Sequence, residues 1–341
     1  MRLGQAHDVR PGSGLCAPTG LAGNEEVSVQ LFFQQLVNGL SLGSLYGLVA
    51  VGYTVVYGII QLINFAHGEI FMIGAFGAIA AWLLIPGDSL SLWMLPVMLL
   101  VGMAAAVGTS LLTERFAYRP LRNAPRLAPL ITAIGVSVFL QEFIRLFFGR
   151  IPGFPDAKRA IVFPQIEHVT GLAIELGPIT VQRAALFTII ALIICWGFLN
   201  VFVNRTQVGR AMQATSQDPD TARLMGINVD RIIMVAFALG AAMAAVAGLC
   251  WGLRYTNIEF RMGFVAGLKA FTAAVLGGIG NINGAVVGGL VLGIIEVMAT
   301  TYIPGQFGGS AWKDVWAFVV LILVLVFRPQ GLLGARVVDR A

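Results

Sequence analysis

Charged residues are scarce in this sequence. Asp, Glu, Lys and Arg together make up 11% of the 341 residues, whereas soluble domains carry roughly 25%. Hydrophobic residues make up 57%, and the mean hydropathy is +0.84. A chain of this composition has too few polar residues to cover a soluble core. Its long uncharged runs instead indicate an all-α integral membrane protein.

Residues that carry catalytic or metal chemistry are equally few. None of the three lysines follows a glycine, so the sequence contains no G-x-x-x-x-G-K-[ST] phosphate-binding loop with which to use ATP. The three histidines (His7, His67 and His168) lie in separate regions, and an odd number of cysteines gives no disulfide framework. An intramembrane serine protease would need a buried Ser–His pair, and only His67 lies among apolar residues. We therefore expect no cofactor and no enzymatic activity.

Long apolar segments predict a polytopic bundle of eight or nine transmembrane helices. Residues 1–28 are polar and lack the apolar core of a signal peptide, so we expect a disordered extension there, a transmembrane domain at 29–334 and a cytoplasmic tail at 335–341. No charged residue occurs from Val27 to Ala66, which is longer than one span requires, so the count depends on how this stretch is divided. The other spans expected are the run ending at Ile85, Leu90–Thr113, Leu127–Phe148, Ala184–Asn204, Ile232–Leu253, Gly263–Gly280, Ile282–Tyr302 and Trp312–Phe327.

Arginine distribution predicts the orientation. Eleven of the 19 arginines fall in residues 113–128, 204–231 and 328–341, and these segments alternate correctly if all three are cytoplasmic. The 150–183 loop balances basic against acidic residues, which favours the outside, and nine spans would place the N-terminus outside as well. The net charge of +5 therefore reports membrane orientation, and we expect lipid contact but no nucleic-acid partner.

A polar segment from Asn204 to Arg231 interrupts the apolar chain and contains the signals of a short capped helix. An N-cap, a proline at the first helical position, an acidic residue at the positive helix end and a left-handed glycine stop follow in order. These residues are Asp218, Pro219, Asp220, Thr221, Ala222, Arg223, Leu224, Met225 and Gly226. Isolated helices of two turns are marginal in water, so the segment is either a docking helix or a solvated loop with one local turn.

A second polar break lies at Asn64, His67 and Glu69, with Gly68 between the last two. Irregular backbone at membrane depth is tolerated where it lines a cavity or is buried in protein. Two interpretations stay open: these residues line a translocation pathway, or they form an interfacial turn whose side chains cap the next helix.

Small residues and two intramembrane charges predict helix contacts. Glycines recur at four-residue spacing in two strips, which lets helices approach closely in lipid: Gly39, Gly43 and Gly47, and Gly280, Gly284 and Gly288. Lys269 and Glu296 lie on opposite arms of an expected hairpin whose turn is Gly277–Gly284. At about 1.5 Å per residue they reach similar depths, so they could form an ion pair, and we favour a structural pair over a transported-ion site.

Four motifs and the tail together resemble the permease subunit of branched-chain amino acid ABC importers. They are NGLSLGSLYGLVAVGYTVVYGIIQLINFAHGE at Asn38–Glu69, FAYRPLRNAPRLAPLITAIG at Phe116–Gly135, QATSQDPDTARLMGIN at Gln213–Asn228, KAFTAAVLGGIGNINGAVVGG at Lys269–Gly289 and FRPQGLLG at Phe327–Gly334. The resemblance runs from about Gln30 to Gly334. Residues 1–28 have no counterpart in it. The motifs are specific for the family and less so for the substrate, because a sister group imports urea or short amides.

This resemblance implies an ABC importer permease fold in the cell inner membrane and a set of partners. They are a second homologous permease subunit, two cytoplasmic ABC ATPase subunits and a periplasmic substrate-binding protein. It also implies that Asp218–Gly226 is the coupling helix that docks on an ATPase subunit. The substrate implied is leucine, isoleucine or valine.

A stand-alone secondary transporter or channel is the alternative of a different class. It would need an ion-coupling group near the midplane, for which Lys269, Glu296 and the His67 break are the candidates. The sequence shows no evident inverted repeat, which disfavours this alternative.

Overall fold

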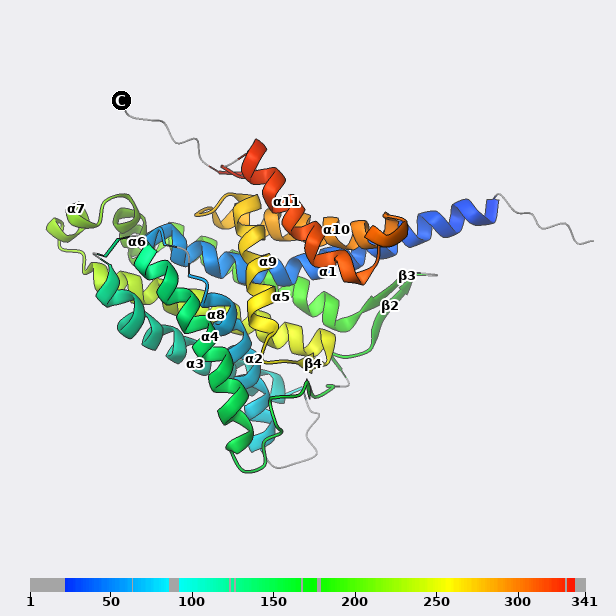
Figure 1. The fold of residues 1–341 in the computed structure, drawn as a ribbon, viewed down its shortest axis with the longest axis horizontal. Coiled ribbons are helices and arrows are strands. Elements are labelled where there is room, and N and C mark those ends of the chain that lie inside the picture. Colours follow the sequence, from blue (N-terminus) through cyan, green and yellow to red (C-terminus); the bar gives the residue numbers. More distant parts are fainter. Residues whose placement is uncertain are drawn as a thin grey trace, which may run out of the picture.

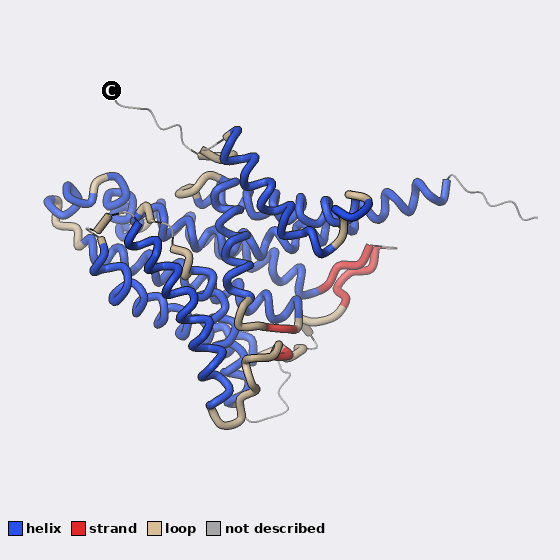
Figure 2. Tube along the Cα trace, in the orientation of Figure 1, coloured by secondary structure: helices blue, strands red, loops and turns tan. Residues whose placement is uncertain are grey.

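The computed structural model describes residues 22–62, 64–85, 92–122, 124–125, 127–166, 168–176, 179–328 and 330–334. Within them the protein is a helical bundle with two small two-stranded sheets (Figure 2). The helices that belong to the candidate membrane spans are α1 (Ala22–Ile60), α2 (His67–Leu84), α3 (Met94–Thr113), α4 (Leu127–Phe147), α5 (Arg183–Arg205), α8 (Val229–Tyr255), α10 (Ile282–Tyr302) and α11 (Lys313–Phe327). The other α-helices are α6 (Gln207–Gln217), α7 (Pro219–Leu224) and α9 (Met262–Gly277). A π-helical turn, Glu114–Tyr118, and a 3₁₀ turn, Arg119–Leu121, follow α3.

The predicted membrane-protein class is confirmed. The described residues contain eight helical segments that are long and apolar enough to span a membrane. α9 is a ninth apolar helix, and its 16 residues are two fewer than the 18 of the shortest of those eight segments. The uncharged stretch from Val27 to Ala66 is not divided, because α1 runs through it as one helix of 39 residues.

The expected boundary of the N-terminal extension is wrong for residues 22–28. These residues form the first turns of α1, so the helix begins before the apolar segment does. Gly23 and Asn24 have low helix propensity, so these turns depend on the helix that is already nucleated in the apolar run. Residues 1–21 and the expected tail at 335–341 lie outside the described residues.

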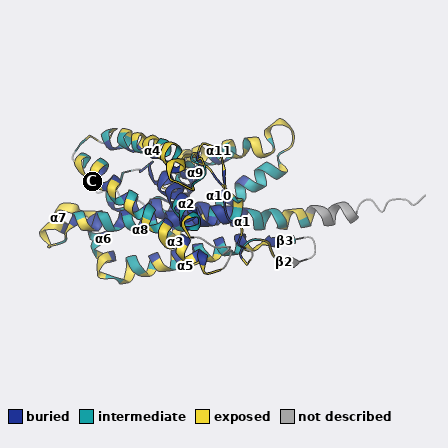
Figure 3. Cartoon of the chain, turned by 90° about the horizontal axis from the view of Figure 1, so that it is seen from below, coloured by how far each residue is buried: buried dark blue, intermediate teal, exposed yellow. Residues whose placement is uncertain are grey.

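Buried helices occupy the centre of the bundle and exposed ones its periphery (Figure 3). Of the 18 most apolar consecutive residues in the α1 span, 83% are buried, whereas only 6% are buried in the span that contains α11. Because both of these helices are apolar, the difference separates a helix that faces protein from one that presents apolar side chains outward, as expected in lipid. α1, α2 and α8 form the core, with α9 and α10 packed against α1.

Glycines allow the closest of these contacts. A Cβ built on Gly293 or Gly289 of α10 would lie 2.2 Å from the Gly43 nitrogen or 2.5 Å from the Gly47 Cα of α1. A Cβ on Gly39 would lie 2.8 Å from the Ile294 Cα. The strip Gly39, Gly43 and Gly47 therefore faces α10.

The second strip needs one correction. Gly284 and Gly288 pack against α9, where an added Cβ would lie 2.4 Å from the Gly277 carbonyl oxygen or 2.1 Å from that of Ala273. Gly280 has no atom within 4 Å of such a Cβ and adopts φ +92°, so it is a turn residue outside the helix contact. It precedes α10, which begins at Ile282 after Asn281 caps it, so the four-residue spacing does not continue to Gly280.

The two ends of the bundle differ in structure (Figure 1). At one end, α6 lies near the α9–α10 turn and α7 follows it, and Leu332 N–H donates to the Leu276 carbonyl, which holds residues 330–334 there. At the other end, β1 (Ile161–Val162) pairs with β4 (Asn257–Ile258), and β2 (Leu172–Leu176) pairs with β3 (Ile179–Gln182). The described parts of the three arginine-rich segments thus share one end, and the described part of the 150–183 loop lies at the other. The sidedness predicted from arginine requires this arrangement.

Candidate functional site

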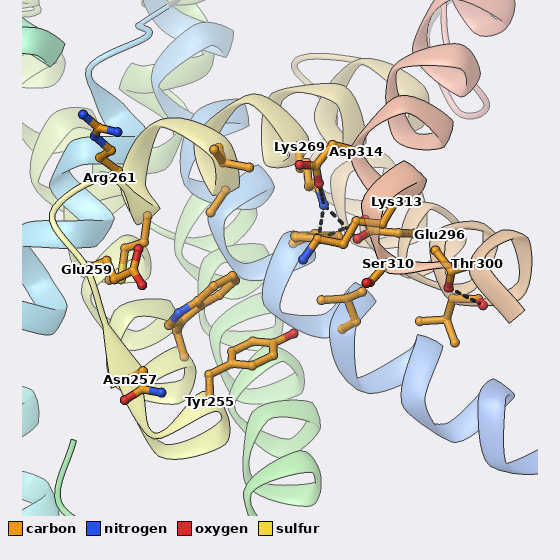
Figure 4. Close-up of a pocket in the computed structure, with 17 residues that line it drawn as sticks. Tyr255, Asn257, Glu259, Arg261, Lys269, Glu296, Thr300, Ser310, Lys313 and Asp314 are labelled. Carbon is orange, nitrogen blue, oxygen red and sulfur yellow. Dashed lines mark hydrogen bonds and ion pairs between the residues drawn. The ribbon is translucent and has the colours of Figure 1, made fainter. Parts of the chain in front are cut away.

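A buried ionic network joins α9 and α10 (Figure 4). Lys269 Nζ of α9 lies 2.7 Å from Glu296 Oε1 of α10, and both side chains are almost completely buried. The same Nζ lies 2.6 Å from Asp314 Oδ1 at the start of α11. Tyr46 of α1 completes the network: its hydroxyl donates to Glu296 Oε2 at 3.0 Å and accepts from Lys269 at 3.2 Å. Four helices therefore meet at one cation.

The network lines a cavity of about 690 Å³, within the range of small-molecule sites. Aromatic side chains from the end of α8, Trp251 and Tyr255, line the cavity, and Glu259 and Arg261 lie across it from Lys269 (Figure 4). Asn257 of β4 also borders it, so the cavity lies on the strand-bearing half of the bundle. It combines charges of both signs with an apolar surface.

The polar residues of the break, Asn64, His67 and Glu69, are buried inside the bundle. His67 is the first residue of α2, and its ring packs against glycines of α1 and α8. A Cβ built on Gly52 of α1 would lie 2.6 Å from the His67 Nε2, and one built on Gly240 of α8 would lie 3.4 Å from its Cε1. Its ring stacks edge-on against Tyr53 at 4.6 Å between centroids. α1 continues eight residues beyond Gly52, so α2 starts well inside the bundle and the break is not an interfacial turn.

Asn64 and Glu69 bind neighbouring elements and do not cap α2. The Tyr118 hydroxyl donates to Asn64 Oδ1 at 2.7 Å. Ser137 and Gln141 of α4 donate to Glu69 Oε1 at 3.0 and 2.7 Å. Asn64 Nδ2, His67 Nε2 and Glu69 Oε2 are buried without a hydrogen-bond partner among the described residues. These three residues do not border the Lys269 cavity, so their pathway-lining role stays a prediction.

The G-x-S-x-G spacing of a nucleophile elbow occurs at Gly39–Gly43, but the structure does not form an elbow there. The segment lies inside the continuous helix α1, whereas an elbow requires a strained strand-to-helix turn. Ser41 is completely buried, and His67 packs beside Gly52, eleven residues further along α1. No Ser–His pair forms among these residues.

An arginine clamp joins the turn after α3 to the first turn of α8. Arg122 pairs with Glu114 and, at 2.5 Å, with Asp230, and Arg119 lies 2.5 Å from the same aspartate. Glu114 is buried, so its carboxylate depends on Arg122. The clamp residues flank the π-helical turn that carries Tyr118, and Tyr118 reaches Asn64 in the break.

α7 is capped as its sequence predicts. Asp218 accepts hydrogen bonds from the backbone N–H groups of Asp220 and Thr221 at 2.9 and 3.2 Å. The Thr221 hydroxyl also donates to this carboxylate, and these bonds lower the pKa of Asp218. Gly226 ends the segment with φ +84°. α6 precedes it as a separate helix, which the sequence analysis did not identify.

α7 exposes apolar side chains outside the membrane spans. Leu224 is 87% exposed and Met225 is 78% exposed, while Ala222 is buried against the rest of the protein. Arg223 pairs only with Asp220 three residues earlier, at 2.7 Å. The helix therefore stands at the end of the molecule, and no other described residue covers the apolar side chains at its tip.

Comparison with known proteins decides the family. The family model for the permease component of branched-chain amino acid transport systems matches residues 35–325. The chain belongs to this permease family. LivH of Escherichia coli strain K12, named a high-affinity branched-chain amino acid transport system permease protein, is 44% identical over 318 residues, which cover 91% of this chain and 97% of that protein.

Other relatives agree in name and extent. BraD of Pseudomonas aeruginosa, named in the same way, is 43% identical over 91% of this chain and 98% of that protein. A probable LivH of Methanocaldococcus jannaschii is 28% identical over 88% of this chain and 91% of that protein. The permease is accordingly a multi-pass inner-membrane protein, as expected.

Two residues of the Lys269 network, Tyr46 and Asp314, are not predicted from the sequence. The pairing of Lys269 with Glu296 is predicted from their similar depth in the membrane. Asp314 carried a usable signal, because it is the only acidic residue between Glu296 and Asp339. Tyr46 carried none, since a tyrosine in an apolar run is ordinary core.

Proposed function

We propose that this permease is one of two related transmembrane subunits of an ABC importer for branched-chain amino acids. Two ATPase subunits dock on its cytoplasmic end, and a periplasmic binding protein delivers substrate to the other. The permease itself binds no ATP and breaks no bond. The observation that carries the proposal is α7, a capped helix with an exposed apolar tip at the arginine-rich end.

The exposure of Leu224 and Met225 supports a docking role. Large apolar side chains that project together from a short helix outside the lipid are exposed to water unless a partner covers them. Both ends of α7 are closed by its own residues, Asp218 and Gly226, so the helix keeps its shape while its tip stays available. A groove on an ATPase subunit is the partner that the family resemblance implies.

The arginine clamp supplies a route by which movement of α7 reaches the bundle. α8 begins at Val229, directly after α7, and its Asp230 is held by Arg119 and Arg122. The adjacent Tyr118 contacts Asn64 in the buried break. ATP-driven displacement of α7 would therefore bias the packing around α2 between outward-open and inward-open arrangements.

Reconstitution tests this function. The permease would be purified with its partner permease and ATPase subunits, placed in liposomes, and supplied with the binding protein. We expect uptake of labelled leucine that requires internal ATP and the binding protein. Uptake of urea with none of leucine would establish the amide-transporting alternative. Leucine uptake without ATPase subunits would establish a secondary transporter.

A further inference from the structure

The Lys269 network contains one cation and two carboxylates, and only one of its members is accessible. Lys269 and Glu296 are almost completely buried, whereas the Asp314 side chain is 44% exposed. Asp314 also belongs to α11, which lies in the least buried of the candidate membrane spans. The Asp314 carboxylate can therefore move away from the Lys269 ammonium while Lys269 and Glu296 stay paired and buried.

From this geometry we infer that the cavity is a binding site for the zwitterionic backbone of an α-amino acid, with Lys269 for the carboxylate and Asp314 for the ammonium. The inference rests on the proposed importer function and names where the permease itself contacts its substrate. In the structure Asp314 occupies the position beside Lys269 that a substrate carboxylate would take. When the carboxylate replaces it, the released Asp314 pairs with the substrate ammonium, so one ion pair is exchanged for two.

Charge balance favours a zwitterion over a singly charged solute. The network side chains alone, Lys269 with Glu296 and Asp314, carry one excess negative charge, which a zwitterion would not change. Around the whole cavity the signs are equal, because Arg261, Lys269 and Lys313 face Glu259, Glu296 and Asp314. A net-neutral molecule with both charges therefore leaves no buried charge without a partner.

The rest of the wall fits an aliphatic side chain. Trp251 of α8 and Met262 and Val265 of α9 border the same cavity. Apolar surface beside a small number of placed polar groups is the usual composition of a small-molecule site. Urea has neither a charge for Lys269 and Asp314 nor an apolar body for this wall, so the site rejects it.

A binding measurement without the binding protein tests the site directly. The purified complex would be titrated with labelled L-leucine, and competitors would be leucinamide, which lacks the carboxylate, 4-methylpentanoate, which lacks the ammonium, and urea. We expect leucine to bind and each competitor to be at least about tenfold weaker. Equal competition by leucine and leucinamide, or no leucine binding at all, would overturn the assignment.

Substitution separates the site from a structural ion pair. Asp314→Asn should weaken leucine binding at least about tenfold, while assembly, measured by size-exclusion chromatography in detergent, stays at the wild-type level. Glu142→Gln is the matched control, because its side chain is similarly exposed, at 42%, and pairs only with Arg145 on the same helix. If the two variants bind leucine equally well, the Lys269–Asp314 contact is structural.

A second variant removes the buried charges together. Lys269→Met with Glu296→Gln leaves no unpaired buried ion, so it should assemble where Lys269→Met alone could fail, and it should not bind leucine. Wild-type binding in this double variant would refute the site. ATP-driven uptake is measured separately: uptake without charge-selective binding refutes this site alone, and absence of uptake in the wild type refutes the importer function.

Discussion

Gly284 marks the point where α10 crosses α9 with no room for a side chain. A Cβ there would lie 2.4 Å from the Gly277 carbonyl oxygen, and backbone cannot move aside as a flexible side chain can. We expect Gly284→Leu to prevent stable assembly, since overpacking costs about 1–3 kcal/mol even where side chains can adjust, and here the side chain would meet backbone. The measurement is the monodisperse fraction in size-exclusion chromatography in detergent. Gly108→Leu is the control, because a Cβ at Gly108 meets no atom within 4 Å; equal profiles would show that Gly284 does not set the helix distance.

Arg122 is the residue on which a buried carboxylate depends. It pairs with Glu114, whose side chain is 1% exposed, and with Asp230. Arg122→Gln would leave Glu114 without a cation, and breaking a buried pair from one side costs about 3 kcal/mol. We expect a clearly lower thermal unfolding midpoint in detergent. Arg145→Gln is the comparison, because its exposed pair with Glu142 is worth at most about 1 kcal/mol. A midpoint shift no larger than that of Arg145→Gln would show that Glu114 finds another partner.

At the scale of elements, α7 depends on its two ends. Asp218→Ala removes the N-cap, and Gly226→Val places a β-branched residue at φ +84°, where such residues are strained. We expect this double variant to leave the membrane bundle folded but to uncouple ATP hydrolysis from leucine uptake in proteoliposomes. Arg205→Gln at the end of α5 should do little. Wild-type coupling in the double variant would mean that the Asn204–Arg231 segment is only a solvated loop.

The cap should be insensitive to pH in the physiological range. Hydrogen bonds from Thr221 and Asp220 lower the pKa of Asp218, so its contribution is present above the unfolded value of about 3.9 and is lost only as pH falls through the lower folded value. Between about pH 6 and 8 the capping of α7 therefore does not change.

Elements differ in how far the sequence predicts them. The positions of the apolar helices and the capping of α7 follow from local composition, and both glycine strips identify helix contacts except at Gly280. The β1–β4 pairing joins residues almost 100 positions apart, and no local pattern encodes it. The meeting of Tyr46 and Asp314 with Lys269 likewise depends on how α1 and α11 cross α9, which is a tertiary property. The division of Asn204–Arg231 into α6 and α7 was missed, although Thr206, the N-cap of α6, lies within this polar segment and is a residue type that favours helix N-termini.

For the whole molecule, the arginine distribution and the two structural ends predict one orientation. A reporter that is active only in the cytoplasm, fused after Arg340, should be active, and the same reporter inserted beside Asp156 should be silent. The reason is that residues 330–334, which precede the tail, lie at the arginine-rich end, while the described part of the 150–183 loop lies with the strands. Expression of each fusion, measured by immunoblot, controls for protein level. The opposite pattern of activity would invert the assignment of α7 to the cytoplasm.

α1 is one continuous helix that connects those two ends. With 39 residues it is about 58 Å long, nearly twice the thickness of the hydrocarbon core. Its outer part carries Gln34, which bonds to Thr180 of β3, and its inner part ends beside α6 and the α9–α10 turn. A tilt of about 5° about the inner end would carry the outer end sideways by about 5 Å. Small rotations at the cytoplasmic side are thus magnified by leverage at the far side, without any bending of the helix.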